Sequence, residues 1–387
     1  MPHLARPQRL AALLVLLTLS TWTVPLAAQA PIPSAEPIPS SAPDPSSAPD
    51  PSPAPEPEPP LDPGARVELR DGLRVTSGEH SVVFRLLGEL RYTNTHDDGA
   101  HTSGFQLSLL RPSVRGRFFD GLLGAFVQTE LAGANARVLD AEVTLTLHDA
   151  FILTAGQFIT PASRAFMTPI PVLLFPDFSV ASVAFREGRD VGGMVHGSFL
   201  GGRLAYYTAL VNGNGINVPT NDNAGLTLVT RLEVMPLGDL RFDNTQTLDA
   251  QSETRFSVAG TSYVDLLSRG DAVVGGDAML VSGPVMVLAE AYAGWLQLRT
   301  VQRRGAYAQI GVTVVPNRLQ LGFRASVLDP DIDAADNAVR VLEGLVAIYG
   351  LGNRAKLMLR YAFSDVGANS TSTQPAHSAV VQLQGWL

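Results

Sequence analysis

Residues 318–328 read Arg-Leu-Gln-Leu-Gly-Phe-Arg-Ala-Ser-Val-Leu, and polar and apolar side chains alternate along this stretch. Successive side chains of an extended strand point to opposite faces, so Leu321 and Phe323 share one face while Gln320 and Arg324 share the other. Such a strand suits a boundary between an apolar and a hydrophilic environment. The stretch therefore predicts a β-strand that is apolar on one flank only.

The same alternation recurs from residue 80 to the C-terminus. At 355–363, for example, Leu357 and Leu359 alternate with Lys356 and Arg360. Sixteen such segments can be counted, separated by clusters of Gly, Pro, Asn and Asp. Their approximate bounds are 80–93, 105–118, 121–132, 138–147, 150–158, 189–199, 203–212, 224–236, 253–264, 271–282, 285–297, 305–315, 318–328, 338–349, 353–364 and 377–387.

The length and number of these segments point to a membrane protein. A soluble sandwich also alternates, but its strands typically have about five or six residues, whereas about 9 to 11 cross a bilayer obliquely. Most of the sixteen segments reach the longer value. The sequence therefore predicts an all-β fold, namely a transmembrane antiparallel β-barrel of about 16 strands.

The connections between the segments support a barrel. On one side they are tight, at 119–121, 148–149, 201–202, 282–284 and 316–317, and on the other side they are long and polar, at 93–104, 212–223, 329–337 and 364–377. Short periplasmic turns that alternate with longer outer loops are typical of outer-membrane barrels, and an even strand number places both termini in the periplasm. Residues 237–252 are an exception, because this long stretch falls on the side of the short turns.

The first 63 residues differ from the rest. Residues 1–30 have the layout of a signal peptide, with Arg6 and Arg9 before the apolar run 10–28; a membrane anchor is the alternative. Residues 31–63 alternate Pro with Ser, Ala, Asp and Glu, which predicts a disordered periplasmic linker of polyproline II type. It serves either as a tether that contacts the cell wall or as a tail without a partner. Residues 64–387 would form the barrel.

Composition excludes several classes of protein. The chain is 45% hydrophobic and 17% charged, below the roughly 25% charged of an ordinary soluble domain. It has no cysteine, so disulfides, thiolate metal sites and cysteine nucleophiles are excluded. Residues 31–63 hold six acids and no base, and with the two arginines before residue 10 this leaves −8 + 6 − 2 = −4 for residues 64–387. This mild excess predicts no nucleic-acid partner.

The strand number predicts a water-filled interior. Backbone groups in hydrocarbon must be satisfied internally, so the sheet must close, and sixteen to eighteen strands leave an aqueous channel where about eight do not. Inward positions are polar, with basic and acidic residues in similar numbers. The acids are Glu89, Glu130, Glu142, Glu233, Asp277 and Glu290. The basic pore-lining candidates are Arg85, Arg91, Arg115, Arg117, Arg231, Arg324, Lys356 and Arg360.

The longest gap between segments, 159–188, predicts a loop that folds into the barrel. It is rich in Phe, Leu, Ile and Pro, which is too apolar for a solvated loop. Thirty residues can reach out and back by about 50 Å at ~3.3 Å per residue, which exceeds a barrel radius. The candidates for the narrowest point are Arg164, Phe166, Asp177, Arg186 and Glu187. The alternatives are an oligomer contact and an external lid.

This loop and its flanks also carry a family resemblance. Residues 156–161 (Gly-Gln-Phe-Ile-Thr-Pro), then Phe166-Met167, then 188–192 (Gly-Arg-Asp-Val-Gly) resemble the corresponding segment of the phosphate-selective porin O and P family. Asp71-Gly72-Leu73 followed by 84–92 resembles that family's first strands. The resemblance spans about 65–387. It implies a sixteen-stranded, usually trimeric barrel that passes small anions.

The chain departs from that family in two ways. Family members tend to carry an acidic residue soon after the proline of the inward loop, where this chain has Ser163 and Arg164. Its basic residues are arginines except for Lys356, and phosphate selectivity needs a run of cations along the pore. The last strand, 379–387, resembles the C-terminal assembly signal of such barrels, although it ends in Leu387.

Other chemistry has little support in the sequence. His96, Asp97, Asp98 and His101 form a loop cluster of a kind that is more often solvated than metal-binding, so no metal site and no cofactor is predicted. His148 and His196 lack a serine partner, which argues against an enzyme.

The functional prediction is an outer-membrane porin of a Gram-negative cell, with its linker in the periplasm. It would allow passive diffusion of small hydrophilic solutes, including anions such as phosphate. The alternatives are a general or cation-preferring porin and a structural barrel that tethers the outer membrane to the cell wall. The predicted partners are outer-membrane lipid, the diffusing solutes, a homotrimer and the cell wall.

Overall fold

The computed structural model describes residues 64–69, 71–97, 99–185, 188–218, 220–242, 247–266, 270–296 and 300–387. The predicted signal peptide (1–30) and Pro-rich linker (31–63) lie outside these residues.

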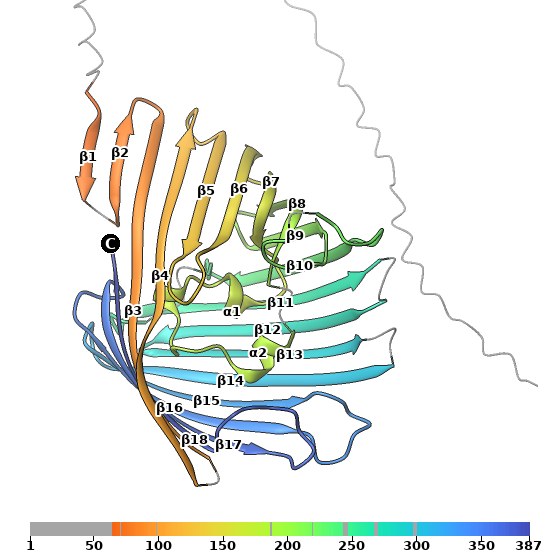
Figure 1. The fold of residues 1–387 in the computed structure, drawn as a ribbon. Coiled ribbons are helices and arrows are strands. Elements are labelled where there is room, and N and C mark those ends of the chain that lie inside the picture. The colour runs from red at the N-terminus through yellow and green to blue at the C-terminus, as the bar shows by residue number, and fades with distance from the viewer. Residues whose placement is uncertain are drawn as a thin grey trace, which may run out of the picture. The chain divides into compact units, whose positions relative to one another are not determined.

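Antiparallel strands make up almost all of the described structure (Figure 1). The strands are β1 (Arg66–Leu69), β2 (Leu73–Ser77), β3 (His80–Asp97), β4 (Ala100–Phe118), β5 (Leu123–Glu130), β6 (Arg137–His148), β7 (Phe151–Ile159), β8 (Arg189–Phe199), β9 (Leu204–Val211), β10 (Thr227–Leu237), β11 (Ser252–Asp265), β12 (Ala272–Gly283), β13 (Val285–Leu296), β14 (Val301–Val315), β15 (Leu319–Asp329), β16 (Val339–Tyr349), β17 (Ala355–Val366) and β18 (His377–Trp386).

The strands from β3 onward close into a barrel. Each strand from β3 to β18 pairs with the next one along the chain, and β18 pairs back with β3, where Gln384 lies opposite Glu89. Closure gives each of these strands a neighbour on both sides, although the outer half of β4, residues 100–112, extends past the end of β5. The prediction of an antiparallel barrel of sixteen strands, β3 to β18, is confirmed.

The two surfaces of the barrel differ as the alternation predicts. On β15, Phe323 is 51% exposed on the outer surface, whereas its neighbour Arg324 is 3% exposed inside. On β18, Leu383 is exposed outside and Gln384 is buried inside. Apolar side chains therefore cover the outside of the barrel, and the polar side chains of these strands point inward.

Two short strands precede the barrel and are not among the sixteen predicted segments. β1 pairs with β2, and β2 pairs with the first residues of β3, where Leu73 lies opposite Phe84. The C-terminal strand β18 occupies the same edge of β3 up to Leu387, whose backbone N–H donates to the carbonyl of Leu86 at 3.1 Å. From Phe84 toward the start of β3, β2 is the neighbour on this edge. Gly72 has φ +111°, and a Cβ there would lie 2.4 Å from the carbonyl oxygen of Phe84, so this approach requires glycine.

The prediction of a long loop at 93–104 is wrong. β3 runs to Asp97 and β4 begins at Ala100, so most of this stretch is a paired hairpin in which the side chains of Thr95 and Thr102 bond to each other. Polar residues occupy both of its faces. A hairpin that is exposed on both faces has no need of alternation, so the sequence pattern resembled a loop.

The long stretch on the side of the short turns is explained by residues 238–242 and 247–251, here called the inward turn. The strand count was right, and these residues fold inside the barrel. Leu240 is fully buried and packs in a core with Leu174, Met279 and Tyr349. The Thr247 hydroxyl donates to the carbonyl of Pro284 at 3.1 Å, which ties the turn to the wall.

Residues 160–185 and 188, here called the inward loop, contain α1 (Arg164–Met167), η1 (Ile170–Val172) and α2 (Val180–Phe185). Figure 1 shows both α-helices on the concave side of the sheet. Its apolar side chains pack against the inner wall: Leu174 and Phe175 are buried, and Phe185 stacks on Tyr292 with ring centroids 5.3 Å apart. The prediction that this loop folds inward is confirmed. Among the described residues, no helix has the length and hydropathy needed to cross a bilayer.

Candidate functional site

The ends of the inward loop are held by residues of the segment that resembles the porin family. The side-chain amide of Gln157 donates to the carbonyls of Val138 and Leu139, and its oxygen accepts from the backbone N–H of Asn217 at 2.7 Å. Arg189 binds both carboxylate oxygens of Asp140, at 2.9 and 3.1 Å. These bonds fix the points at which the chain leaves the wall and returns to it.

The first contact that holds the loop inside the barrel is made by Arg164 in α1. Its guanidinium is fully buried. Nε donates to Asp277 at 2.7 Å, and Nη2 donates to Ser257 at 2.8 Å and also to Glu233. Phe242 of the inward turn lies against the same group, 5.2 Å from ring centroid to Cζ. A buried charge persists only when it is paired and hydrogen-bonded, which this group is.

Residues next to Arg164 bind a third wall carboxylate, Glu290. The hydroxyl of Ser163 and the backbone N–H of Ala165 donate to it at 2.9 and 2.8 Å. Arg231, a predicted pore-lining residue, also binds Asp277, at 2.6 Å. The serine and arginine that depart from the family pattern therefore pair with acids of the wall.

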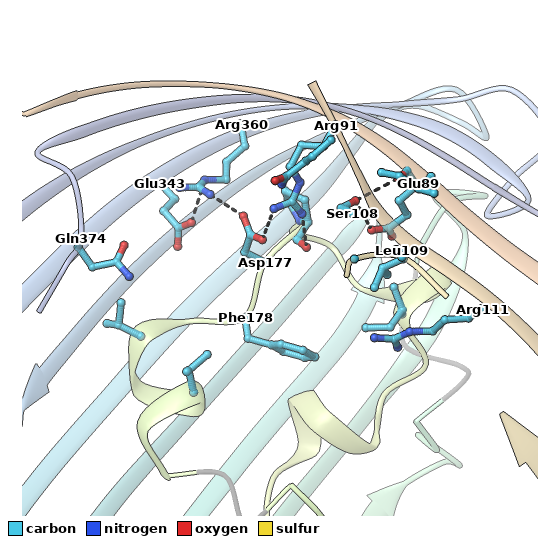
Figure 2. A pocket seen from close by; sticks show the side chains of 18 of the residues that line it. Glu89, Arg91, Ser108, Leu109, Arg111, Asp177, Phe178, Glu343, Arg360 and Gln374 are labelled. Carbon is cyan, nitrogen blue, oxygen red and sulfur yellow. Dashed lines mark hydrogen bonds and ion pairs between the residues drawn. The ribbon is translucent and has the colours of Figure 1, made fainter. Parts of the chain in front are cut away.

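The second contact is made by Asp177, which Figure 2 shows between Arg91 and Arg360. Its two carboxylate oxygens accept from these arginines at 2.8 and 2.6 Å, and its backbone carbonyl accepts from Arg324 at 2.8 Å. Glu343 pairs in turn with Arg324 and Arg360. Burial alone would raise the pKa of Asp177, but the charges and hydrogen bonds of Arg91 and Arg360 outweigh it and hold the pKa below its usual value.

The third contact is made by Lys356, the only lysine in the sequence. Its ammonium donates to the carbonyls of Pro171 and Leu173 at 3.0 and 2.8 Å, and the residue is 1% exposed. Each of the three contacts joins the inward loop to the barrel wall through a charged side chain. Together they hold the inward loop along its length.

These contacts divide the predicted pore-lining residues into two groups. Arg91, Arg231, Arg324 and Arg360 each bind a carboxylate, and Lys356 binds two carbonyls. The other group comprises Arg85, Arg115 and Arg117, which are exposed on the inner surface of β3 and β4.

The exposed group is positively charged. Within the described part of the chain, Arg115 and Arg117 bind no carboxylate. Arg115 lies over Phe126, 4.1 Å from its ring centroid, within electrostatic range of Arg85, Arg117 and Glu142. Arg85 donates to the carbonyl of Asp71 at 2.7 Å.

The lumen is therefore uneven. The inward loop and inward turn pack against the wall of β10 to β17, where inner side chains such as Asp277, Glu290 and Glu343 are buried. On β3 to β6, inner side chains such as Arg115 and Gln128 keep contact with solvent, whereas others such as Glu89 and Glu130 are buried. The accessible interior lies beside the exposed part of this wall.

A cavity of about 560 Å³ lies between the inward loop and the wall (Figure 2). β3, β4, β16 and β17 and the loop around Asp177 line it. Its charged residues are Glu89, Arg91, Arg111, Asp177, Glu343 and Arg360. Each of the three arginines has a carboxylate partner, which for Arg111 is Glu130 at 2.7 Å.

The remaining constriction candidates are placed as follows. Phe166 stacks on Phe178 of the same loop with ring centroids 4.1 Å apart, and Phe178 lines the cavity. Arg186 and Glu187 lie outside the described residues. The described residues hold no group of three or more His, Cys, Asp or Glu side chains placed to bind a metal ion.

Three contributors to the site were not predicted. Glu343 lies on the inner face of β16, where its neighbours Val341 and Leu345 are buried beneath covering segments, so most residues on both faces of this strand are apolar and alternation does not single out Glu343. Arg111 follows a β-bulge in β4 that shifts the alternation between Leu107 and Leu109. Phe242 belongs to the inward turn, and no local pattern distinguishes such a turn from a surface loop.

A closed barrel of sixteen strands, apolar outside and polar inside, with a long loop folded into its lumen, defines the fold class of the outer-membrane porins. The sequence matches no protein-family model. It also matches no curated protein.

Solved structures share the fold. OmpF of Salmonella typhi, in complex with daunomycin, superposes with a TM-score of 0.62 at 11% identity, over 81% of this chain and 100% of that one. An anion-selective porin from Comamonas acidovorans gives 0.60 at 11%, over 80% and 100%. The trimer form of OmpT of Vibrio cholerae gives 0.56 at 10%, over 80% and 99%. At such identities the likeness establishes the fold alone.

Proposed function

We propose that this barrel is an outer-membrane porin through which small hydrophilic solutes diffuse passively, with a preference for anions. The observation that carries the proposal is the position of Arg85, Arg115 and Arg117, which are exposed on the accessible inner wall of β3 and β4. Rings or rows of charged side chains at a pore wall select the opposite charge. The acids on the opposite wall, such as Asp277 and Glu233, are covered and bound to arginine.

A general anion preference fits better than selectivity for phosphate. A desolvated oxyanion exchanges water for several charge-assisted hydrogen bonds, which requires a continuous row of free cations. Arg324 and Arg360, further along the lumen, already bind Glu343 and Asp177. The three exposed arginines attract anions in general, but they do not form a site that could replace the water shell of a phosphate ion.

The surroundings follow from the two surfaces. The apolar outer surface would contact outer-membrane lipid, and the ends of β3 and β18 at the side of the short turns would face the periplasm with the linker. A homotrimer is part of the proposal, supported by the trimer form of the structurally similar OmpT. Contact of the linker with the cell wall remains a prediction from the sequence.

Reconstitution of the full chain in planar bilayers tests the proposal. We expect stepwise single-channel conductance, and in a KCl gradient a reversal potential of the sign that chloride permeation gives. A potential of the opposite sign would replace anion preference by cation preference. A chain that inserts without conducting would leave a structural tether as its function.

A further inference from the structure

One charged side chain of the cavity in Figure 2 is left without its full set of partners. Glu89 is 2% exposed, and its Oε2 accepts only the hydroxyl of Ser108, at 3.3 Å. Its Oε1 is buried and has no hydrogen-bond partner among the described residues. A buried carboxylate oxygen without a donor is unfavourable, and Glu89 lines the cavity, so a donor that approaches this carboxylate from the cavity would stabilise it.

The neighbouring cations do not supply that donor. Arg91 directs its N–H groups to Gln382, Asp177 and the carbonyl of Pro176. Lys356 directs its ammonium to two carbonyls of the inward loop. Both groups lie close enough to Glu89 to interact with its charge, but their hydrogen bonds are made elsewhere.

A second charged group of the cavity, Arg111, has N–H donors without an acceptor in the described part of the chain. Arg111 binds Glu130 through Nε, and within the described residues its Nη1 and Nη2 have no protein acceptor. Arg111 lies opposite Leu87 in the β3–β4 ladder, and Glu89 is two residues further along the same face. Diagonal neighbours of this kind lie about 7–8 Å apart, within reach of two long side chains.

We propose that this cavity binds a small zwitterion, with its ammonium on Glu89 and its carboxylate on Arg111, as the solute passes through the pore. A simple cation at Glu89 would face Arg111, and a simple anion at Arg111 would face Glu89, so only a solute with both charges satisfies both groups. The volume of about 560 Å³ accommodates a molecule of the size of an amino acid. The inference rests on the proposed diffusion function.

Two isomers of equal size and zero net charge give a matched pair of probes: glycine, which is a zwitterion, and glycolamide, which carries no charges. Swelling of proteoliposomes that contain the full chain measures the entry of each. We expect glycine to enter faster than glycolamide at low concentration and its rate to saturate, since binding precedes passage. Glu89→Gln should reduce the glycine-to-glycolamide ratio by roughly tenfold, the value of a hydrogen bond to a charged group.

The controls separate this inference from the proposed function. Arg111→Lys retains a charge for Glu130 but loses the planar fork, so it should also lower the ratio. Glu253→Gln, the same chemical change at an exposed position of β11, should leave the ratio unchanged. KCl conductance is recorded for every variant. A native chain that conducts KCl, with equal ratios in the native and Glu89→Gln proteins, would overturn zwitterion binding alone, and a native chain that does not conduct would overturn the diffusion function.

Discussion

Arg164 in the inward loop and Asp277 on β12 form an ion pair inside the barrel, with Nε and Oδ1 2.7 Å apart and both side chains almost fully buried. The same guanidinium binds Glu233 on β10. One loop residue thus neutralises two acids of the wall. This contact is one of the three that hold the inward loop against the wall.

We expect Arg164→Met to release the loop from the wall. Among the described residues, the variant leaves Glu233 and Asp277 with Arg231 as their only guanidinium partner, and breaking a buried pair costs about 3–5 kcal/mol. Limited proteolysis should cut the loop around Phe166 in the variant and not in the native protein. Arg340→Met, which breaks the exposed pair with Asp365, is the control and should change little. Equal cleavage in native and variant proteins would argue against Arg164 as the holding contact.

Lys356 provides a chemical test of the same loop. Because its ammonium is buried and bonded to two carbonyls, an amine-reactive reagent should modify it at least about tenfold more slowly in the folded barrel than after unfolding. Peptide mass mapping identifies the site directly, since the sequence has no other lysine. Rapid modification in the folded state would mean that the loop leaves this wall in solution.

Alternation along the sequence was sufficient to predict the barrel but not its interior. The side chains of Arg115 and Arg231 occupy equivalent inward positions, and nothing local distinguishes them. Only the packing of the inward loop and inward turn leaves Arg115 exposed and buries Arg231 against Asp277. Long-range packing of this kind has no periodicity, so the sequence predicted which residues point inward but not which ones solvent reaches.

Removal of the exposed arginines should weaken anion preference. Two unit charges 4 Å apart interact by about 1 kcal/mol in water, so Arg115→Gln with Arg117→Gln should lower the chloride-to-potassium permeability ratio by up to roughly fivefold. The reversal potential in a KCl gradient measures this ratio. The effect should fade at about 1 M salt, where the Debye length is only about 3 Å. Arg324→Gln, which removes a cation already bound to Glu343, should change the ratio less. A larger change in this variant would contradict the proposal that solutes pass along the exposed inner wall of β3 and β4.

Asp177 predicts how the lumen responds to acid. Because Arg91 and Arg360 hold the pKa of Asp177 below its usual value of about 3.9, its carboxylate stays ionised in mild acid. A lowered pKa in the folded state stabilises the loop contact above the unfolded pKa, and this contribution is lost only as the pH falls through the lower folded value. Single-channel conductance should therefore show no transition due to Asp177 between pH 7 and about pH 4. Asp177→Asn, which leaves Arg91 and Arg360 without this carboxylate, should alter conductance already at pH 7. A transition of the native channel near pH 5 to 6 that is absent from Asp177→Asn would show instead that this carboxylate takes up a proton in mild acid, contrary to its pairing with two arginines.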